Sequence, residues 1–372
     1  MRRLVVLVAS LMLGVAPSAS AAPVKSDNVK QIANLELGRT TELALQGRYA
    51  YAVGATTISV IDRASMKVVG ALECVPGING TEVEVLNKGF IAFEASGGCG
   101  VPGLAIVDVR NPRKPRIVGG SAPVNAHTIT AYPGKPIIYV SPNGAIGSPN
   151  AAEQIVDARD PANPKVLEYR TGGIGCHDVS FLITKKLKLA ACAGGSETQL
   201  WDVSDPLAPV GISRIPTPQV FFNHSAVISP DGNLLVVGDE AYGATSCAGT
   251  PTGALWFYDI SNPATPIFQG YYNIARGSAV SSFFATPDTW CTAHMYNFKP
   301  GTRILATAWY QGGINVLELS DPRVPVELGF YMNDGEFSPW AAYWDGDRIW
   351  TADEHADKGG VEVFQIKLNE AR

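Results

Sequence analysis

Four of the five histidines in this 372-residue chain recur at one position of a repeating pattern. When the repeated β-hairpins are aligned by their turns, that position holds His127, His177, His224 and His294 in four consecutive units. Neutral imidazoles that converge on one point are common ligands for copper, zinc and iron. Three or four such ligands with an open coordination position would form a catalytic metal site. The sequence therefore predicts a transition metal (copper, zinc or iron) bound by these four histidines.

Acidic pairs follow two of the predicted strands and extend this hypothesis. Asp239-Glu240 and Asp353-Glu354 lie at matching strand ends, and the fifth histidine, His355, follows the second pair. Such carboxylates are candidate catalytic groups, as metal ligands, as partners that orient an imidazole, or as a general base. The alternative is structural, because paired acids after a strand also cap turns.

Aromatic residues cluster near the histidine-bearing hairpins. We expect an apolar pocket for a small organic ligand or substrate, lined by Phe222, Tyr242, Trp309, Trp340 and His355. Packing in the core between repeats is the alternative for the aromatic residues. The histidines have an alternative too, as polar residues that satisfy buried backbone groups or channel water.

One sequence motif recurs through the chain, and the strands around it are expected to position these side chains. Each copy is an apolar or β-branched run, usually ending in an acidic residue and followed by proline, and the copies are 45 to 59 residues apart. The clear copies are LAIVDVRNPRKP from Leu104, EQIVDARDPANP from Glu153, TQLWDVSDPLAP from Thr198, LWFYDISNPATP from Leu255 and INVLELSDPRVP from Ile314. Weaker copies, ISVIDRASMKVV from Ile58 and VEVFQIKLNEAR from Val361, bring the number of units to seven.

Each unit reads as four short antiparallel strands. The apolar run is one strand, and the Asx-Pro pair ends it because proline cannot donate to a strand ladder. An upstream hairpin turns at Pro-Gly or Asp-Gly, as in HSAVISPDGNLLVVGD from His224. The units predict an all-β fold, a seven-bladed β-propeller with four-stranded antiparallel blades. The first strand of each blade lines the central channel, so the equivalent residues of the seven blades form a ring around the axis. Besides the four histidines, this ring contains Thr41, Thr81 and Ser338.

The two ends of the repeat array complement each other. The last unit stops after its third strand, VEVFQI, and residues 31–37 resemble the missing fourth strand. We therefore expect the N-terminal strand to join the last blade and close the ring, which removes exposed sheet edges. Residues 22–372 then form a single propeller domain.

The phrase LAIVDVRNP and its relatives resemble the LVIVD-repeat proteins, a family of bacterial β-propellers. The resemblance covers the predicted mature chain and implies the fold, but the family has no single agreed function. The hairpins with a leading histidine are more remotely similar to those of selenium-binding and methanethiol-oxidase propellers. That second resemblance implies histidine-bound metal in the channel.

The first 21 residues are predicted to form a cleaved signal peptide, which indicates export. Arg2 and Arg3 precede a short apolar run, and Ala-Ser-Ala at 19–21 supplies a cleavage pattern. The run is too short for a membrane anchor, so we expect a secreted or periplasmic protein without a membrane span. An excess of Asp and Glu over Lys and Arg, 34 against 29, argues against a nucleic-acid partner.

Six cysteines in an exported chain favour disulfides. Sequence alone leaves 15 connectivities open, and the repeat favours Cys74–Cys99, Cys176–Cys192 and Cys247–Cys291.

Three functions agree with these features. The first is a metal-dependent oxidoreductase or hydrolase that acts on a small organic substrate at the axial site. The second is a non-catalytic propeller that binds a ligand or protein on its loops, since the fold does not define the function. The third is a metal-independent enzyme that uses histidine and carboxylate groups in the channel.

Overall fold

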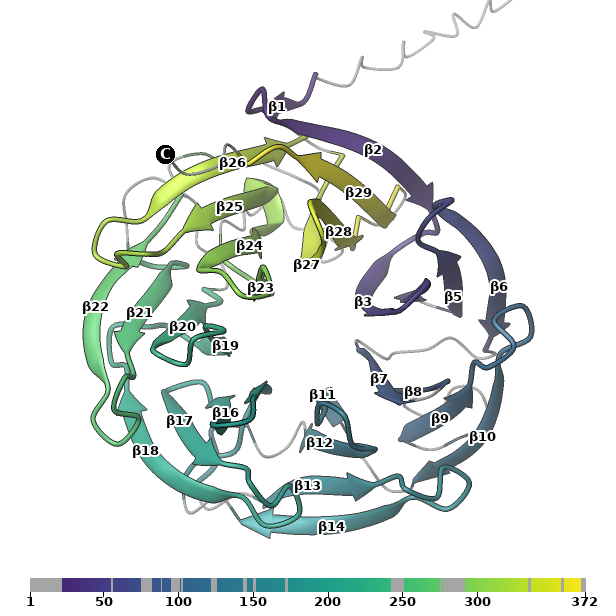
Figure 1. Ribbon diagram of the computed structural model, residues 1–372, viewed down its shortest axis with the longest axis horizontal. Coiled ribbons are helices and arrows are strands. Elements are labelled where there is room, and N and C mark those ends of the chain that lie inside the picture. Colours follow the sequence, from purple (N-terminus) through teal and green to yellow (C-terminus); the bar gives the residue numbers. More distant parts are fainter. Residues whose placement is uncertain are drawn as a thin grey trace, which may run out of the picture.

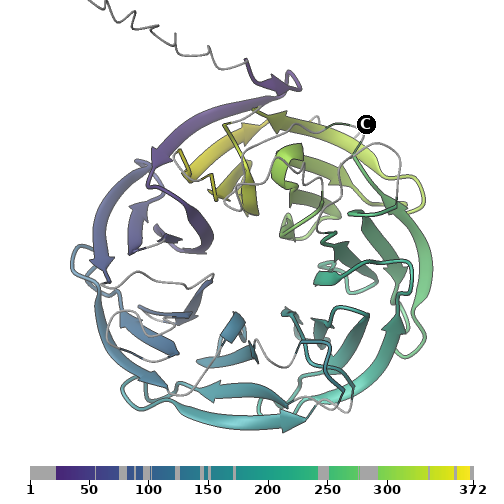
Figure 2. The same cartoon turned by 180° about the vertical axis from the view of Figure 1, so that it is seen from behind.

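Seven antiparallel sheets surround a central axis in the computed structural model of the protein (Figure 1). The same closed ring is visible from the opposite face (Figure 2). The structure describes residues 22–368 except 55, 75–81, 88, 95–100, 102, 122–125, 143–145, 150–151, 171–172, 242–250, 275, 277–291, 334–335 and 356–357. The seven-bladed, all-β fold predicted from the repeats is confirmed.

The strands of each blade follow one another from the channel to the rim. Blade one contains, in that order, β3 (Thr40–Gln46), β4 (Tyr49–Gly54), β5 (Thr57–Asp62) and β6 (Lys67–Glu73). Blade two contains β7 (Val83–Asn87), β8 (Phe90–Glu94), β9 (Leu104–Asp108) and β10 (Arg116–Ser121). Blade three contains β11 (Ala126–Ala131), β12 (Ile137–Pro142), β13 (Ala152–Asp157) and β14 (Lys165–Arg170). Blade four contains β15 (Asp178–Ile183), β16 (Lys188–Ala193), β17 (Glu197–Asp202) and β18 (Val210–Pro216).

The remaining three blades have the same plan. Blade five contains β19 (Asn223–Ile228), β20 (Leu234–Asp239), β21 (Leu255–Asp259) and β22 (Ile267–Tyr272). Blade six contains β23 (Tyr296–Phe298), β24 (Ile304–Ala308), β25 (Ile314–Glu318) and β26 (Val326–Met332), and the short helix η2 (Tyr310–Gly312) follows β24. Blade seven contains β27 (Pro339–Asp345), β28 (Arg348–Asp353), β29 (Gly360–Ile366) and β2 (Val29–Glu36).

The ring closes through the N-terminal segment, as predicted. β2 pairs antiparallel with β29 and forms the outer strand of blade seven. The preceding strand β1 (Val24–Lys25) pairs with β26 and adds a fifth strand to blade six. Between β1 and β2, the side chains of Ser26 and Asn28 donate hydrogen bonds to backbone carbonyls of β26 in blade six. The segment 24–36 therefore ties blades six and seven together.

Apolar side chains between adjacent sheets hold the ring together. Blades four and five share a core that includes Leu200, Leu235 and Trp256, and blades five and six share one around Phe257 and Trp309. Asp residues at the ends of the third strands accept backbone hydrogen bonds two residues later, for example Asp108 from Arg110 N and Asp202 from Ser204 N. These contacts fix the turns that the Asx-Pro pattern predicted.

Cys176 and Cys192 form the predicted disulfide in blade four. Cys74 is also disulfide-bonded, while Cys99, Cys247 and Cys291 lie outside the described residues. No helix in the described part of the chain has the length and apolar character needed to cross a membrane.

Candidate functional site

β-Bulges at the start of the inner strands place one set of side chains at the channel mouth. The ladders of β11, β19 and β27 each skip one residue, and the skipped residues are His127, His224 and Trp340. The equivalent residue in blade one is Thr41. A bulge leaves one residue unpaired and re-aims its side chain. His177 and His294 lie just before the inner strands of blades four and six, at the same level of the ring.

The structure corrects the residue expected at this position in blade seven. The aligned sequence places Ser338 there, but Trp340 is the bulged residue of β27. Ser338 N donates to Asp353 Oδ1, just as Phe222 N donates to Asp239 Oδ1 in blade five. Ser338 is therefore the counterpart of Phe222, two residues before the ring position.

A second set of matched residues follows the second strands of blades five, six and seven. The end of each second strand pairs in the sheet with the first residue of the repeated motif in the same blade. These pairs are Gly238–Leu255, Ala308–Ile314 and Ala352–Val361. Two residues further along each chain segment stand Glu240, Tyr310 and Glu354. In blade four the same position is Gly195.

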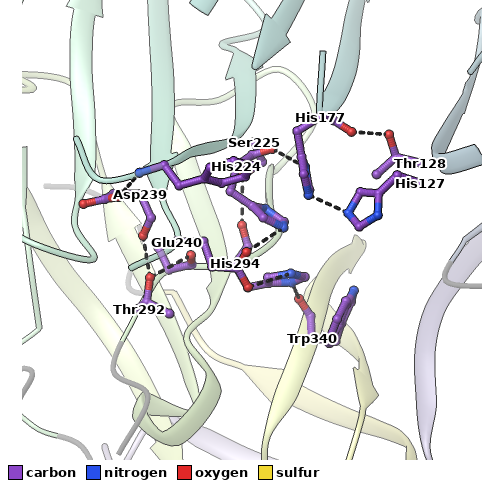
Figure 3. A network of polar contacts seen from close by, with 12 residues as sticks. His127, Thr128, His177, His224, Ser225, Asp239, Glu240, Thr292, His294 and Trp340 are labelled. Carbon is purple, nitrogen blue, oxygen red and sulfur yellow. Dashed lines mark hydrogen bonds and ion pairs between the residues drawn. The ribbon is translucent and has the colours of Figure 1, made fainter. Parts of the chain in front are cut away.

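The four predicted histidines form a continuous row (Figure 3). Ring centroids are 4.3 Å apart for His127–His177, 4.1 Å for His177–His224 and 4.2 Å for His224–His294. Inner strands also bind the backbone of the next blade, since Thr128 Oγ1 donates to His177 O and Ser225 Oγ donates to His294 O at 2.9 Å. The row is thus built on backbone that is held from blade to blade.

Backbone carbonyls set the tautomers of two imidazoles. His177 Nδ1 lies 2.9 Å from His224 O, and His294 Nδ1 lies 2.6 Å from Trp340 O. A carbonyl can only accept, so each Nδ1 carries the proton and each Nε2 carries a lone pair. The buried Nε2 of His294 accepts no hydrogen bond from any described residue. Such an atom is ready to bind a metal ion.

His224, His294 and Glu240 bring three metal-binding atoms within 4.8 Å of one another. His224 Nε2 is 3.3 Å from Glu240 Oε2, and His294 Nε2 is 3.8 Å from Glu240 Oε1. Tyr310 Oη donates to Glu240 Oε1 at 2.7 Å. All four side chains are buried. This group could hold a metal ion, and the tyrosine hydroxyl orients its carboxylate.

Burial keeps these imidazoles neutral, which metal binding requires. It lowers the pKa of His177 and of His224 well below the usual range, and the neighbouring histidines add to the effect. For His294, burial lowers the pKa to about 3, against the raising effect of its bond to Trp340 O.

Glu354 is a second buried carboxylate beside this group. Its side chain is fully buried, and neither oxygen has a hydrogen-bond partner among the described residues. Arg39 Nη2 lies 3.8 Å from Glu354 Oε2. Burial raises the pKa of Glu354 to about 8, with a lowering effect from Arg39 and raising effects from Asp353 and Glu240. At neutral pH this group therefore carries a proton in most molecules.

Asp239 and Asp353 bind loop backbone instead of facing the histidines. Asp239 accepts from Phe222 N and Gly253 N, both at 2.9 Å. Asp353 Oδ1 accepts from Ser338 N and His355 N, both at 3.0 Å. These contacts fit the turn-capping alternative.

The predicted pocket residues fall into two groups. Phe222 and Trp340 are half-buried and flank the histidine row, with ring centroids 5.1 Å from His177 and 4.2 Å from His294 respectively. Trp309 is fully buried in the core between blades five and six. His355 Nδ1 accepts a hydrogen bond from Lys358 N within the loop after β28. Tyr242 lies outside the described residues.

The sequence analysis gave Tyr310 no role. The available signal was its register, because it stands where blades five and seven carry glutamate. A tyrosine between two glutamates at one level of a ring is well placed to donate to either.

Together, the fold and this site define a seven-bladed β-propeller with a histidine and glutamate cluster where its first strands begin and its second strands end. Residues 252–274 match the LVIVD repeat family model, in agreement with the recurrent phrases of the sequence. Among solved structures, the crystal structure of RRP9 WD40 repeats is similar with a TM-score of 0.62 at 10% identity, covering 94% of this chain and 100% of that one. This likeness concerns the fold alone. No curated protein matches the chain in sequence.

Proposed function

We propose that this protein is an exported, metal-dependent hydrolase that acts on a small organic substrate at the channel mouth. His224, His294 and Glu240 would hold one divalent ion. The observation that carries the proposal is the convergence of their three ligand atoms within 4.8 Å in a buried setting. Two histidines and one glutamate form the ligand set of several catalytic zinc sites, which keep a further position open.

The chemistry of the donor set supports a resident ion. Both imidazoles are neutral because of burial, and His294 Nε2 has no hydrogen bond from a described residue. Tyr310 fixes one carboxylate oxygen of Glu240, as partners of metal ligands commonly do. When bound, a divalent ion would lower the pKa of a coordinated water and supply a nucleophile near neutral pH.

Glu354 is the proposed proton-transfer group. It lies close enough to Glu240 for the two charges to interact, and its own pKa of about 8 allows both protonation states near neutral pH. A general acid or base works best when its pKa lies near the working pH. Arg39 at 3.8 Å would limit the cost of the ionised form.

Phe222 and Trp340 are the proposed walls of the substrate pocket. Both rings flank the histidine row and are only partly buried. A substrate with an apolar or aromatic part would cover them. We assign no catalytic role to Asp239 and Asp353, whose oxygens accept backbone hydrogen bonds.

An oxidoreductase is the second candidate, because two histidines and one carboxylate also suit Fe(II) in oxygen chemistry. Export rests on residues 1–21 and agrees with the Cys176–Cys192 disulfide, since disulfides persist in oxidising compartments.

Elemental analysis of the natively purified protein tests the metal centre. Near-stoichiometric zinc or iron is expected in the wild type and should be lost in His294→Gln and Glu240→Gln proteins that keep their β-sheet circular dichroism. His355→Gln is the matched control, because it removes a histidine outside the row.

The identity of the metal then selects the substrates to screen. Zinc directs the screen to ester and amide hydrolysis, and iron directs it to oxidation. A wild type that contains no metal and takes up none would contradict the proposal and favour the non-catalytic binding function.

A further inference from the structure

A cavity of about 290 Å³ lies among the innermost strands of four neighbouring blades, six, seven, one and two (Figure 1). Its wall includes Glu84 of β7, Phe298 of β23, and Tyr343 and Trp344 of β27. We propose that this cavity, called the ammonium pocket below, binds a small organic cation, an amine or a quaternary ammonium compound. The site is separate from the metal centre proposed above, and neither depends on the other.

The ammonium pocket lies further along the channel than the histidine row. In blade seven, Tyr343 comes three residues after Trp340 of the row. In blade six, Phe298 comes four residues after His294. A strand advances about 3.3 Å per residue, so roughly 10 Å of channel separates the two levels. None of the three residues of the metal-binding group lines the pocket.

Four carboxyl groups on or beside the inner strands favour a positively charged occupant. They are Glu42, Glu82, Glu84 and Asp178, and no described lysine or arginine forms an ion pair with any of them. Burial raises the pKa of Glu84 well above its usual range, and repulsion by Glu42 and Asp178 adds to the effect, against the lowering effect of two backbone hydrogen bonds. A cation beside Glu84 would stabilise its ionised form.

The rest of the wall decides which kind of cation fits. Aliphatic and aromatic side chains predominate in it, among them Leu43, Leu45, Val83, Val85, Phe298 and Trp344. Aromatic rings attract ammonium groups and are the usual means of binding quaternary ammonium ligands. A metal ion such as Ca²⁺ needs about six to eight oxygen ligands, but no three of the described acids in the channel bring their oxygens within 4.8 Å of one another. The pocket therefore suits an organic cation and not a bare metal ion.

Contacts within the chain identify the groups that would meet the ligand. Lys299 Nζ lies 5.3 Å from the centroid of the Trp344 ring, and Asp347 balances its charge at 2.6 Å, so this ring already accepts an ammonium group. The hydroxyl of Tyr343 donates to Glu42. Glu84 is the carboxyl group among the described residues of the pocket wall, and it would pair with the ammonium group of the ligand.

Isothermal titration calorimetry with benzyltrimethylammonium tests the pocket. The wild type should bind one equivalent per chain, and benzyl alcohol, which lacks the charge, should bind about tenfold more weakly or less. Since Glu84 must lose its proton to pair with the cation, binding should release protons, and the measured heat should depend on the ionisation enthalpy of the buffer. His294→Gln should bind the probe like the wild type.

Two variants assign the binding to this pocket. Glu84→Gln keeps the size of the side chain but removes its charge, so it should bind the probe about tenfold more weakly and without proton release. Leu45→Lys adds a competing ammonium group to the pocket wall and should also weaken binding. Glu73→Gln, on the exposed face of β6, is the matched control and should bind like the wild type.

The inference is overturned if the wild type does not bind benzyltrimethylammonium at millimolar concentrations, or if benzyl alcohol binds as tightly. It is also overturned if folded Glu84→Gln and Leu45→Lys proteins bind the probe like the wild type, or if His294→Gln abolishes binding. A wild type that binds the probe through Glu84 but contains no metal supports the ammonium pocket and counts against the metal centre alone.

Discussion

Tyr310 of blade six donates a hydrogen bond from Oη to Glu240 Oε1 of blade five at 2.7 Å. The backbone of Tyr310 has a φ of 39°, in the left-handed region that residues other than glycine rarely adopt. Glu240 in turn lies 3.3 Å from His224 Nε2. Unfavourable backbone conformations persist where the surrounding structure enforces them, often at functional sites. We infer that Tyr310 is a positioning residue for Glu240.

The first prediction is that Tyr310→Phe weakens metal binding without removing a ligand. The variant keeps the ring that packs against His294 and Trp340 but leaves Glu240 Oε1 without its tyrosine donor. Loss of such a partner typically costs 10- to 100-fold in metal affinity. Competition with a chromophoric chelator measures this change.

Tyr331→Phe is the control for this variant. Tyr331 is also buried, and its hydroxyl donates to Gln31 Oε1 of β2 at 3.2 Å, in the closure region of the ring. The metal affinity of the Tyr331→Phe protein should equal that of the wild type. Equal losses in both variants would refute a specific role for Tyr310.

The fold was predictable because its determinants are local and repeated. Proline and Asx residues end the third strand of most blades, so the copies at Leu104, Thr198 and Leu255 are visible without any long-range information. The N-terminal closure was predictable because blade seven lacked an outer strand. β1 was missed because a two-residue strand carries no pattern of its own.

The site was predictable only in part. The histidine register follows from the repeat, but the bulge in β27 moves Trp340 into the position assigned to Ser338. The orientation of the imidazoles depends on hydrogen bonds between neighbouring blades, which cannot be inferred from the sequence. His177 Nδ1 binds a carbonyl of the next blade, which turns its Nε2 towards His127 and away from Glu240.

The second prediction concerns pH and Glu42 on the inner strand of blade one. The side chain is 3% exposed, and burial raises its pKa from 4.5 to about 8, with a smaller raising effect from Asp178 and lowering effects from bonds to Tyr343 and Leu43. Between these two values the folded chain holds a proton that the unfolded chain has lost. Stability should therefore fall as pH rises from about 5 to 8, by at most about 1.4 kcal/mol per pH unit for this group.

Urea unfolding at several pH values measures this effect. Glu42→Gln cannot ionise, so the slope of its stability against pH should be shallower than that of the wild type. Glu73→Gln, on the exposed face of β6, is the control and should follow the wild type. Parallel curves for all three proteins would show that Glu42 does not titrate as expected.

The third prediction uses Gly195, which stands in blade four where blade five has Glu240. Its φ is +79°, and an added Cβ would lie 3.1 Å from the Phe222 ring. Gly195→Ala should destabilise the protein by roughly 1–3 kcal/mol because of the backbone conformation, with a further loss from the contact with Phe222.

Gly134→Ala separates these two causes. Gly134 has nearly the same φ, +80°, and nothing lies within 4 Å of an added Cβ. Urea unfolding should therefore show a smaller loss for Gly134→Ala than for Gly195→Ala. Equal losses would mean that Phe222 moves aside at no cost.

The fourth prediction concerns the Cys176–Cys192 disulfide of blade four, which lies next to His177 in the sequence. Cys176 and Cys192 are fully buried and 16 residues apart in sequence, and Cys176 is adjacent to His177. Replacement of both by alanine frees the unfolded chain from this loop constraint and should lower the free energy of unfolding by about 2–4 kcal/mol. Zn²⁺ binding at His224, His294 and Glu240 should remain, and an unchanged urea midpoint would contradict the stabilising role of the bond.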